Sequence, residues 1–69
     1  MELKTISAVV GQHADTIELS FDPDRPESPV WYRYPDVSED WQSCPFQSAD
    51  LRHLSDQDAC EFVDAWVED

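Results

Sequence analysis

The hydrophobic pattern of this chain has the period of a strand in the first half and the period of a helix at the end. Residues 16–21 alternate strictly between apolar and polar side chains, so one side can face a core and the other can face water. Residues 3–10 and 30–34 are rich in β-branched and aromatic side chains, which favour strands. Residues 55–69 repeat apolar side chains at i, i+3, i+4 and i+7 and predict a helix.

The predicted C-terminal helix has an apolar face and an acidic face. The apolar stripe consists of Ala59, Phe62, Val63, Trp66 and Val67. Glu61, Asp64 and Glu68 are expected nearly opposite this stripe. Ser55 is the expected N-cap, because its hydroxyl can accept a backbone N–H at the start of the helix. Asp64, Glu68 and Asp69 lie near the negative end of the helix dipole, where a negative charge is unfavourable. An unfavourable local arrangement without a structural gain indicates a function.

The segments between these elements carry turn-forming residues. Residues 11–15 include the only glycine of the chain and predict a hairpin loop between the first two strands. Residues 22–29 contain three prolines, which predict a stiff surface loop. Residues 36–50 have no sustained period, so they form either a long ordered loop or a short extra strand near residues 44–47.

These elements predict an α+β fold: a three-stranded antiparallel β-meander packed against one C-terminal amphipathic α-helix, as a single small domain over residues 1–69. Leu51 and Leu54 are expected to connect the last loop to the helix core. A chain of this length buries only about 60% of its unfolded surface, so its core is thin and leaves no room for a deep substrate pocket.

The charge of the chain is strongly negative and unevenly distributed. Sixteen acids oppose four Lys and Arg residues, and the net charge is −12. Residues 36–69 hold ten of the acids and a single base, Arg52. Such a surface attracts basic partners and repels nucleic acid and anionic membranes, although a purely solubilising surface has the same composition. With 41% hydrophobic residues the chain is too apolar for a disordered acidic tail, so the carboxylates are held at fixed spacings.

No motif for catalysis or cofactor binding is visible in the sequence. Cys44 and Cys60 are expected as reduced thiols, with Cys60 at the edge of the apolar helix face. Together with His13 and His53 they match none of the compact ligand pairs of structural zinc. We therefore predict that the protein is not an enzyme and uses neither metal nor cofactor. The start of the chain lacks a signal-peptide pattern and no apolar run could span a membrane, which predicts a soluble, cytoplasmic protein.

Two tryptophans allow either a structural or an interfacial interpretation. In a strand over residues 30–34, Trp31 and Arg33 share one face, where Trp31 either packs at the sheet edge under the proline loop or forms part of an interface. Trp41 lies among Asp36, Glu39 and Asp40, which resembles an aromatic anchor inside an acidic rim. Alternatively, Trp41 could pack the helix onto the sheet together with Phe46.

The favoured function is inhibition by mimicry of nucleic-acid phosphates. Acids at helical spacing recur every 5 to 6 Å or so, close to the roughly 6 to 7 Å step between phosphates on one strand. Glu61, Asp64 and Glu68 would form one row, and a second set would comprise Asp36, Glu39, Asp40, Asp56 and Asp58, next to Trp41 and Asp69. In size, acidity and lack of catalytic motifs the chain resembles the small DNA-mimic inhibitors that phages use against host defence, including anti-CRISPR proteins. This resemblance implies an anti-defence protein that blocks a basic nucleic-acid-binding protein or complex in the host cytoplasm and binds no nucleic acid itself.

The alternative function is an acidic protein-binding module, such as an immunity protein, an antitoxin-like partner or an assembly adaptor. Trp31, Trp41 and Phe46 would then be the anchors, and the acids would form a steering rim. A third possibility is a small acidic structural domain of a larger protein.

Overall fold

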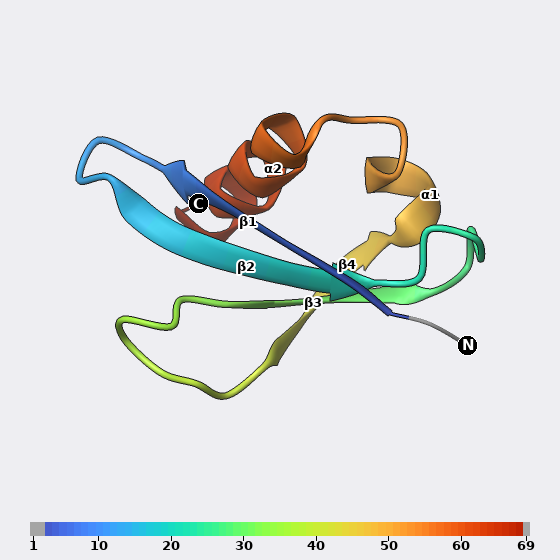
Figure 1. Cartoon of the computed structure of the whole chain (residues 1–69), viewed down its shortest axis with the longest axis horizontal. Helices are drawn as coiled ribbons and strands as arrows, with labels where there is room; N and C mark the ends of the chain where they lie inside the picture. Colours follow the sequence, from blue (N-terminus) through green and yellow to red (C-terminus); the bar gives the residue numbers. More distant parts are fainter. Residues whose placement is uncertain (1–2, 69) are drawn as a thin grey trace.

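Four antiparallel strands lie side by side in the order in which the chain visits them, and a C-terminal helix covers one face of the resulting sheet (Figure 1). This computed structural model describes residues 3–68. The elements are β1 (Lys4–Val10), β2 (Asp15–Phe21), β3 (Pro29–Arg33), β4 (Gln42–Gln47), α1 (Ser48–Leu51) and α2 (Asp56–Glu68). The predicted α+β class, the antiparallel meander and the C-terminal helix are confirmed.

The predicted strand number is wrong, because the sheet has a fourth strand. β4 pairs with β3 from Tyr32 opposite Gln42 to Pro29 opposite Gln47, and the register shifts between these pairs. A short extra strand near residues 44–47 is one of the two alternatives that the sequence allows for this segment, and β4 confirms it; Pro45, which lacks a backbone N–H, weakens the strand pattern. A proline is tolerated here because β4 is an edge strand and its pairing contains an irregularity.

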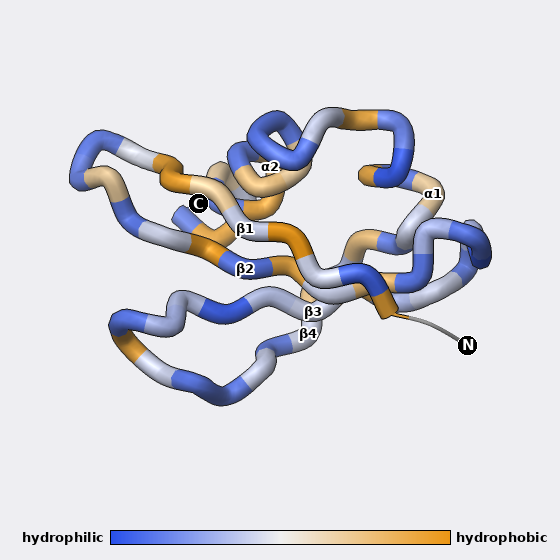
Figure 2. Tube along the Cα trace, viewed as in Figure 1, coloured by the Kyte–Doolittle hydropathy of each residue, from blue (hydrophilic) through white to orange (hydrophobic). Residues whose placement is uncertain are grey.

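The core lies between α2 and the inner face of the sheet. The β1–β2 register pairs Ile6 with Leu19, so their side chains share the face that α2 covers. Figure 2 shows the alternation of apolar and polar residues along these two strands. The buried apolar residues are Ile6, Val10, Ile17, Leu19, Phe21, Val30, Leu51, Ala59, Cys60 and Val63. Leu54 packs against this cluster, so the predicted role of the segment before α2 is confirmed.

The start of α2 is as the sequence predicts, but the buried face of the helix is rotated. The backbone N–H of Asp58 donates to Oγ of Ser55 at 3.2 Å, which confirms the N-cap. Cys60 is fully buried, whereas Phe62 and Trp66 of the predicted stripe are 45% and 38% exposed. Most contacts of α2 with the sheet are to β1, so these two aromatic side chains lie on the flank of the helix.

The flank of α2 is joined to the far half of the sheet by aromatic contacts. Phe46 of β4 packs edge-on against Phe62 and Trp66, with ring centroids 4.8 and 5.8 Å apart. Tyr32 of β3 packs edge-on against Trp66 at 5.9 Å. Edge-to-face pairs at these distances are favourable beyond their buried area. Phe46 therefore holds the helix on the sheet, the structural role that the sequence left open.

Candidate functional site

The β3–β4 loop, residues 34–41, holds the predicted acidic rim in a defined shape. The carbonyl of Tyr34 accepts the backbone N–H groups of Val37 and Ser38 at 2.8 and 2.9 Å. The backbone N–H of Asp40 donates to Oγ of Ser38, and Nη1 of Arg33 donates to the Glu39 carbonyl at 3.1 Å. These bonds fix a loop that has no regular secondary structure. Its acidic side chains, Asp36, Glu39 and Asp40, are exposed as predicted.

The C-terminal end of α2 lies beside this acidic loop. Val67 of the helix and Val37, Asp40 and Tyr34 of the loop region line a shallow hollow of about 260 Å³. Glu68 is exposed, and its Oε1 lies 3.7 Å from the position that a Cβ atom would take at Gly11, in the turn between β1 and β2. The last acid of the described helix therefore lies beside that turn, whereas Val67 reaches the acidic loop.

Asp64 is not part of an exposed row, and this corrects the expected geometry of Glu61, Asp64 and Glu68. Its side chain is only 7% exposed and accepts a 2.6 Å hydrogen bond from the hydroxyl of Tyr34. The rotation of α2 turns Asp64 toward the sheet, so a row of three acids at phosphate spacing does not exist on this helix. Asp69 lies outside the described residues.

The acids at the start of α2 form a separate exposed group. Asp56 lies 3.9 Å from Nζ of Lys4, a distance at the limit of an ion pair, and both side chains are more than half exposed. Asp58 is exposed, and Glu61 accepts a hydrogen bond from Gln57 at 3.2 Å. Nε2 of Gln57 also donates to the carbonyl of Val9 on the edge strand β1. This group faces solvent beside β1, apart from the β3–β4 loop.

Trp41 lies on the outer face of the sheet, opposite α2, so it does not pack the helix onto the sheet. The guanidinium of Arg33 lies over its indole, 4.3 Å from the ring centroid. Nε of Arg33 donates at 2.7 Å to Oε1 of Glu18, which pairs with it across β2 and β3. Arg33 is therefore held between an aromatic face and a carboxylate, and Trp41 stays 38% exposed.

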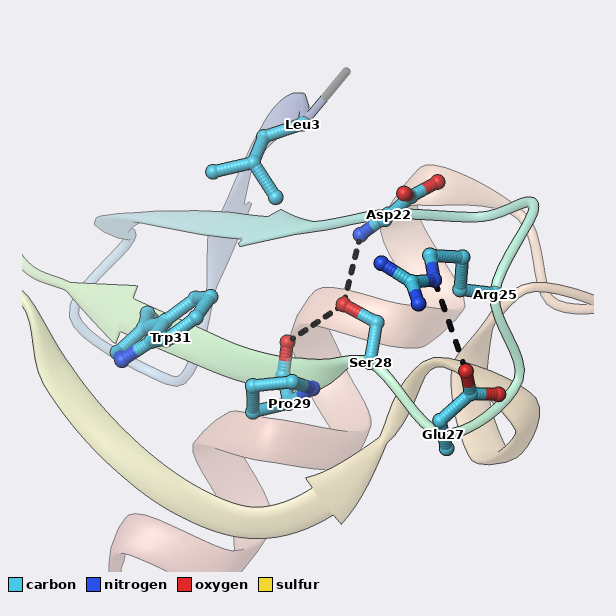
Figure 3. Close-up of a pocket in the computed structure, with 7 residues that line it drawn as sticks. All are labelled: Leu3, Asp22, Arg25, Glu27, Ser28, Pro29 and Trp31. Atoms are coloured by element: carbon cyan, nitrogen blue, oxygen red, sulfur yellow. Dashed lines mark hydrogen bonds and ion pairs between the residues drawn. The ribbon is translucent and has the colours of Figure 1, made fainter. Parts of the chain in front are cut away.

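The outer face also carries a groove that the sequence did not reveal. A cross-strand row places Trp31 between Ser20 of β2 and Ser43 of β4. The bulky indole stands above these two small side chains, so hollows form beside it. A hollow of about 400 Å³ lies between Trp31, Leu3 and the proline loop, and one of about 240 Å³ extends toward Trp41 (Figure 3). We call these hollows the outer groove, bounded by Leu3, Ser20, Pro29, Trp31 and Trp41.

The sequence contains part of the signal for the outer groove. It correctly places Trp31 and Arg33 on one strand face, and Trp31 beside the proline loop, as the lining of the larger hollow shows. Leu3 and Ser20 were missed, because only the register of β1, β2 and β3 shows that they lie next to Trp31.

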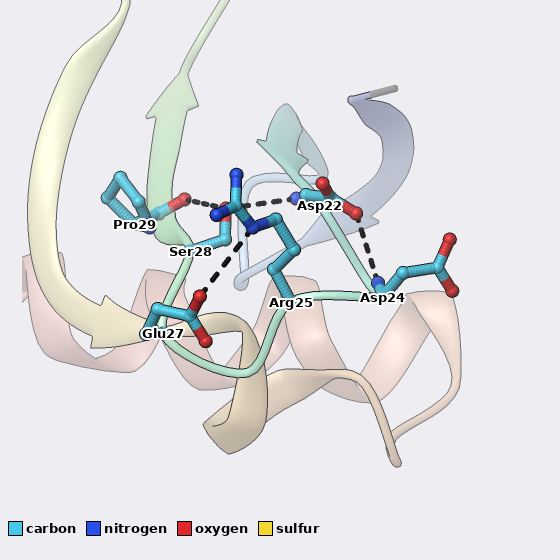
Figure 4. A network of polar contacts seen from close by, with 6 residues as sticks. All are labelled: Asp22, Asp24, Arg25, Glu27, Ser28 and Pro29. Carbon is cyan, nitrogen blue, oxygen red and sulfur yellow. Dashed lines mark hydrogen bonds and ion pairs between the residues drawn. The ribbon is translucent and has the colours of Figure 1, made fainter. Parts of the chain in front are cut away.

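The proline loop, residues 22–29, forms a rigid wall at one end of the outer groove. The backbone N–H of Asp22 donates to Oγ of Ser28, and that hydroxyl donates to the carbonyl of Pro29, each at 3.2 Å (Figure 4). Oδ1 of Asp22 accepts the backbone N–H of Asp24 at 3.0 Å. These bonds close the loop on itself.

Two more backbone bonds tie the same loop to the start of α1. The backbone N–H of Ser48 donates to the Ser28 carbonyl, and that of Ala49 to the Pro26 carbonyl. At the tip of the loop, Arg25 and Glu27 are exposed and lie 3.6 Å apart. Both side chains line the larger hollow, at the end away from Trp31 (Figure 3).

No family model, curated protein or solved structure matches this chain. Its function therefore rests on the geometry of its own residues. No helix among residues 3–68 is long and apolar enough to cross a membrane.

The two cysteines, Cys44 and Cys60, have raised pKa values. Burial raises the pKa of Cys44, and burial followed by the charge of Asp56 raises the pKa of Cys60 to about 11. Both free thiols are therefore protonated at neutral pH and are weak nucleophiles. In the described part of the chain, no group of three or more His, Cys, Asp or Glu residues is arranged to hold a metal ion.

Proposed function

We propose that this protein is an acidic inhibitor that binds a nucleic-acid-binding protein or complex and blocks its basic groove, in an anti-defence role of the anti-CRISPR kind in the host cytoplasm. The observation that carries this proposal is the excess of carboxylates without basic partners. Within residues 3–68 three ion pairs are formed, and two of them are long and exposed. Most acids thus keep their full charge for an external partner.

The acids support two contact regions on this protein. The first is the β3–β4 loop with Asp36, Glu39 and Asp40, all three exposed. The second is the start of α2 with Asp56, Asp58 and Glu61. Each rim ion pair in water is worth only about 0.2–1 kcal/mol, so affinity would come from many such pairs. Binding would therefore weaken steeply with added salt.

A competition experiment tests this proposal. The partner is captured from host lysate at low salt, purified, and titrated with this protein in the presence and absence of duplex DNA. Mutual exclusion is expected, because both ligands use the same basic groove. Simultaneous binding with unchanged affinity would refute the blocking function.

Matched charge variants sharpen this test. The double substitution Glu39→Gln/Asp40→Asn should lower affinity for the partner about two- to thirtyfold, if each lost rim pair is worth about 0.2–1 kcal/mol. The control Asp15→Asn/Asp24→Asn removes the same charge from two other exposed positions. Equal effects of the two doubles would indicate non-specific electrostatic attraction rather than a defined contact.

A second function is favoured by one specific observation, the two tryptophans on the uncovered sheet face. In that case the protein is an aromatic-anchored binding module for a partner that need not bind nucleic acid. One tryptophan substitution would then abolish binding of the captured partner, and duplex DNA would not compete.

A further inference from the structure

We infer that the outer groove binds an extended cationic segment of a partner protein, in which one apolar side chain enters the hollow between Leu3 and Trp31. A neighbouring arginine or lysine of the segment lies on the indole of Trp31, in the hollow that Glu27 also lines. This inference deepens the proposed function and rests on it for the basic character of the partner.

The groove is an unfilled apolar site in the described structure. α2 covers the inner face of the sheet, and no other helix or strand of residues 3–68 covers the outer face (Figure 1). Leu3 is 51% exposed and Trp41 is 38% exposed, although this small core could use every large side chain. Figure 3 shows the side chains of Leu3 and Trp31 directed toward the same space. Apolar walls of this kind favour an apolar side chain from outside.

The charge around the groove selects a cationic occupant. Glu27, the buried Asp22 and the exposed Arg25 lie at the end formed by the proline loop, where two carboxylates outnumber one guanidinium, and Glu39 and Asp40 lie on the loop beyond Trp41. The one guanidinium at the Trp41 end, that of Arg33, is already paired with Glu18. A second copy of this chain would bring another charge of −12 to the same surface, which disfavours self-association there.

The protein already contains an example of the proposed contact. The Arg33 guanidinium lies on the indole of Trp41 and bonds a carboxylate at 2.7 Å. At Trp31, the indole and the exposed carboxylate of Glu27 line the same hollow from its two ends. Glu27 is only weakly engaged by Arg25, since the two groups lie 3.6 Å apart and are largely exposed. A guanidinium or ammonium from a partner would therefore find an aromatic face at one end of the hollow and a carboxylate at the other.

The dimensions of the sheet set the length of the segment. The groove runs from Leu3, just before β1, across β2 and β3 to Trp41, just before β4. Neighbouring strands are about 4.8 Å apart, so three steps span about 14 Å, the length of about four or five extended residues. The segment crosses the strands and is recognised by its side chains.

The test is a titration of the whole protein with a blocked peptide of sequence Gly-Arg-Leu-Arg-Gly, followed by two-dimensional NMR. The indole N–H signals of Trp31 and Trp41 and the methyl signals of Leu3 should shift. Two matched peptides replace both arginines by glutamate or the leucine by alanine. Each should bind at least about tenfold more weakly, because each lacks one of the two contacts.

Two exposed residues of the outer face provide a matched pair of variants. Leu3→Ala should weaken binding of the arginine–leucine peptide by about three- to tenfold, because it removes one wall of the groove. Val9→Ala should not change it, since Val9 is equally exposed, at 53%, but does not line either hollow. Trp31→Ala should weaken binding by about tenfold or more. If Trp31→Ala fails to fold, the pair of Leu3 and Val9 variants still decides the question.

Three results would overturn the inference. They are peptide-induced shifts at Asp58 and Glu61 instead of the groove, equal binding of the leucine and alanine peptides, and equal effects of Leu3→Ala and Val9→Ala. Each would leave the proposed inhibition intact, because acids alone could still block a basic partner. Conversely, the peptide could bind in the groove while the captured partner binds this protein and duplex DNA at the same time. That result would refute the proposed inhibition but not the inference about the groove.

Discussion

The hydroxyl of Tyr34 donates a 2.6 Å hydrogen bond to Oδ1 of Asp64, and this contact joins the β3–β4 loop to the C-terminal half of α2. Asp64 is 7% exposed, so its carboxylate needs such a donor. An acid that the sequence places on a charged surface thus has a structural role. The same bond holds the acidic loop against the helix.

The first prediction concerns the loss of this bond. Tyr34→Phe should lower the free energy of unfolding by about 1–3 kcal/mol, because it leaves the buried carboxylate without this donor. Chemical denaturation at neutral pH measures the effect. Tyr32→Phe is the control, since it removes a hydroxyl that has no hydrogen-bond partner among residues 3–68. Equal losses for the two variants would show that the bond contributes nothing specific.

The second prediction is that stability decreases at alkaline pH. Burial, then the hydrogen bond with Asp64 and its charge, raise the pKa of Tyr34 above its ordinary value of 10.0. Burial and the charge of Asp56 raise the pKa of Cys60 from 9.0 to about 11. Above the unfolded pKa, the folded state binds more protons than the unfolded state, so stability falls as pH rises.

The order of the two titrations gives this prediction its test. The Cys60 contribution is complete below pH 9.0 and is lost between there and about pH 11, whereas the Tyr34 contribution begins to be lost near pH 10.0. Denaturation midpoints of the wild type should therefore decrease from about pH 9 upward. Cys60→Ala should reduce the first part of the decrease without abolishing it, because burial also raises the pKa of Cys44 from 9.0. A midpoint that is constant up to pH 11 would contradict the assignment of both groups.

The sheet was largely predictable because its first three strands follow simple patterns. The strict alternation in β2 fixes which side chains point to the core, and Gly11 marks the turn between β1 and β2. β4 was predictable only as one of two alternatives for its segment, because Pro45 and exposed polar residues weaken the pattern of an edge strand whose inner side chains are few. Its pairing partner is the preceding strand, β3, and the residues between the two strands have no period that shows where the pairing begins.

The helix illustrates a different limit of sequence reasoning. Periodicity shows that α2 has an apolar face but not how far the helix is rotated about its axis. Phe62 and Trp66 are large enough to define an apolar stripe, yet they sit at the flank because Phe46 and Tyr32 offer them a second packing surface. This rotation buries Asp64 and divides the expected acidic row. The outer groove escapes prediction for a similar reason, since it depends on which small residues flank Trp31 on neighbouring strands.

The third prediction concerns the two residues of the β1–β2 turn with positive φ. Gly11 has φ +76° and Ala14 has φ 55°. A residue with a Cβ atom loses roughly 1–2 kcal/mol in this conformation. Gly11→Ala should therefore destabilise the protein by about that amount. A Cβ at Gly11 would lie 3.6 Å from Oδ2 of Asp64, an ordinary contact, so the cost is due to the backbone and not to a clash.

The reverse substitution serves as the matched control. Ala14→Gly should relieve the backbone strain at this position. The free energy of unfolding should rise by up to about 1 kcal/mol, once the entropy cost of a glycine is subtracted. Thermal melts of both variants measure the difference. A loss of similar size in both variants would mean that the turn does not hold these dihedral angles in solution.

The fourth prediction is that added salt stabilises the folded protein. At an ionic strength of about 0.01 M the screening length is about 30 Å, so carboxylates across a molecule 32 Å long repel one another. At about 1 M the screening length falls to about 3 Å, and this repulsion vanishes. If the net repulsion is about 1 kcal/mol, the melting temperature should rise by about 4–8 °C over this range.

A variant without the charges of Glu61 and Glu68 tests whether these carboxylates cause the rise in melting temperature. Both are exposed on α2, and Glu68 lies at the negative end of the helix dipole, where a carboxylate is unfavourable. Glu61→Gln/Glu68→Gln should therefore melt at a higher temperature than the wild type at low salt, and the two proteins should converge at high salt. Non-ionic effects of the salt act equally on both proteins, so the difference between them isolates the charge. Two results would contradict this prediction: a melting temperature that is independent of salt, and a variant that is less stable than the wild type at low salt. Either would show that groups within the fold neutralise the charge of these acids, so that this charge is not available to a partner.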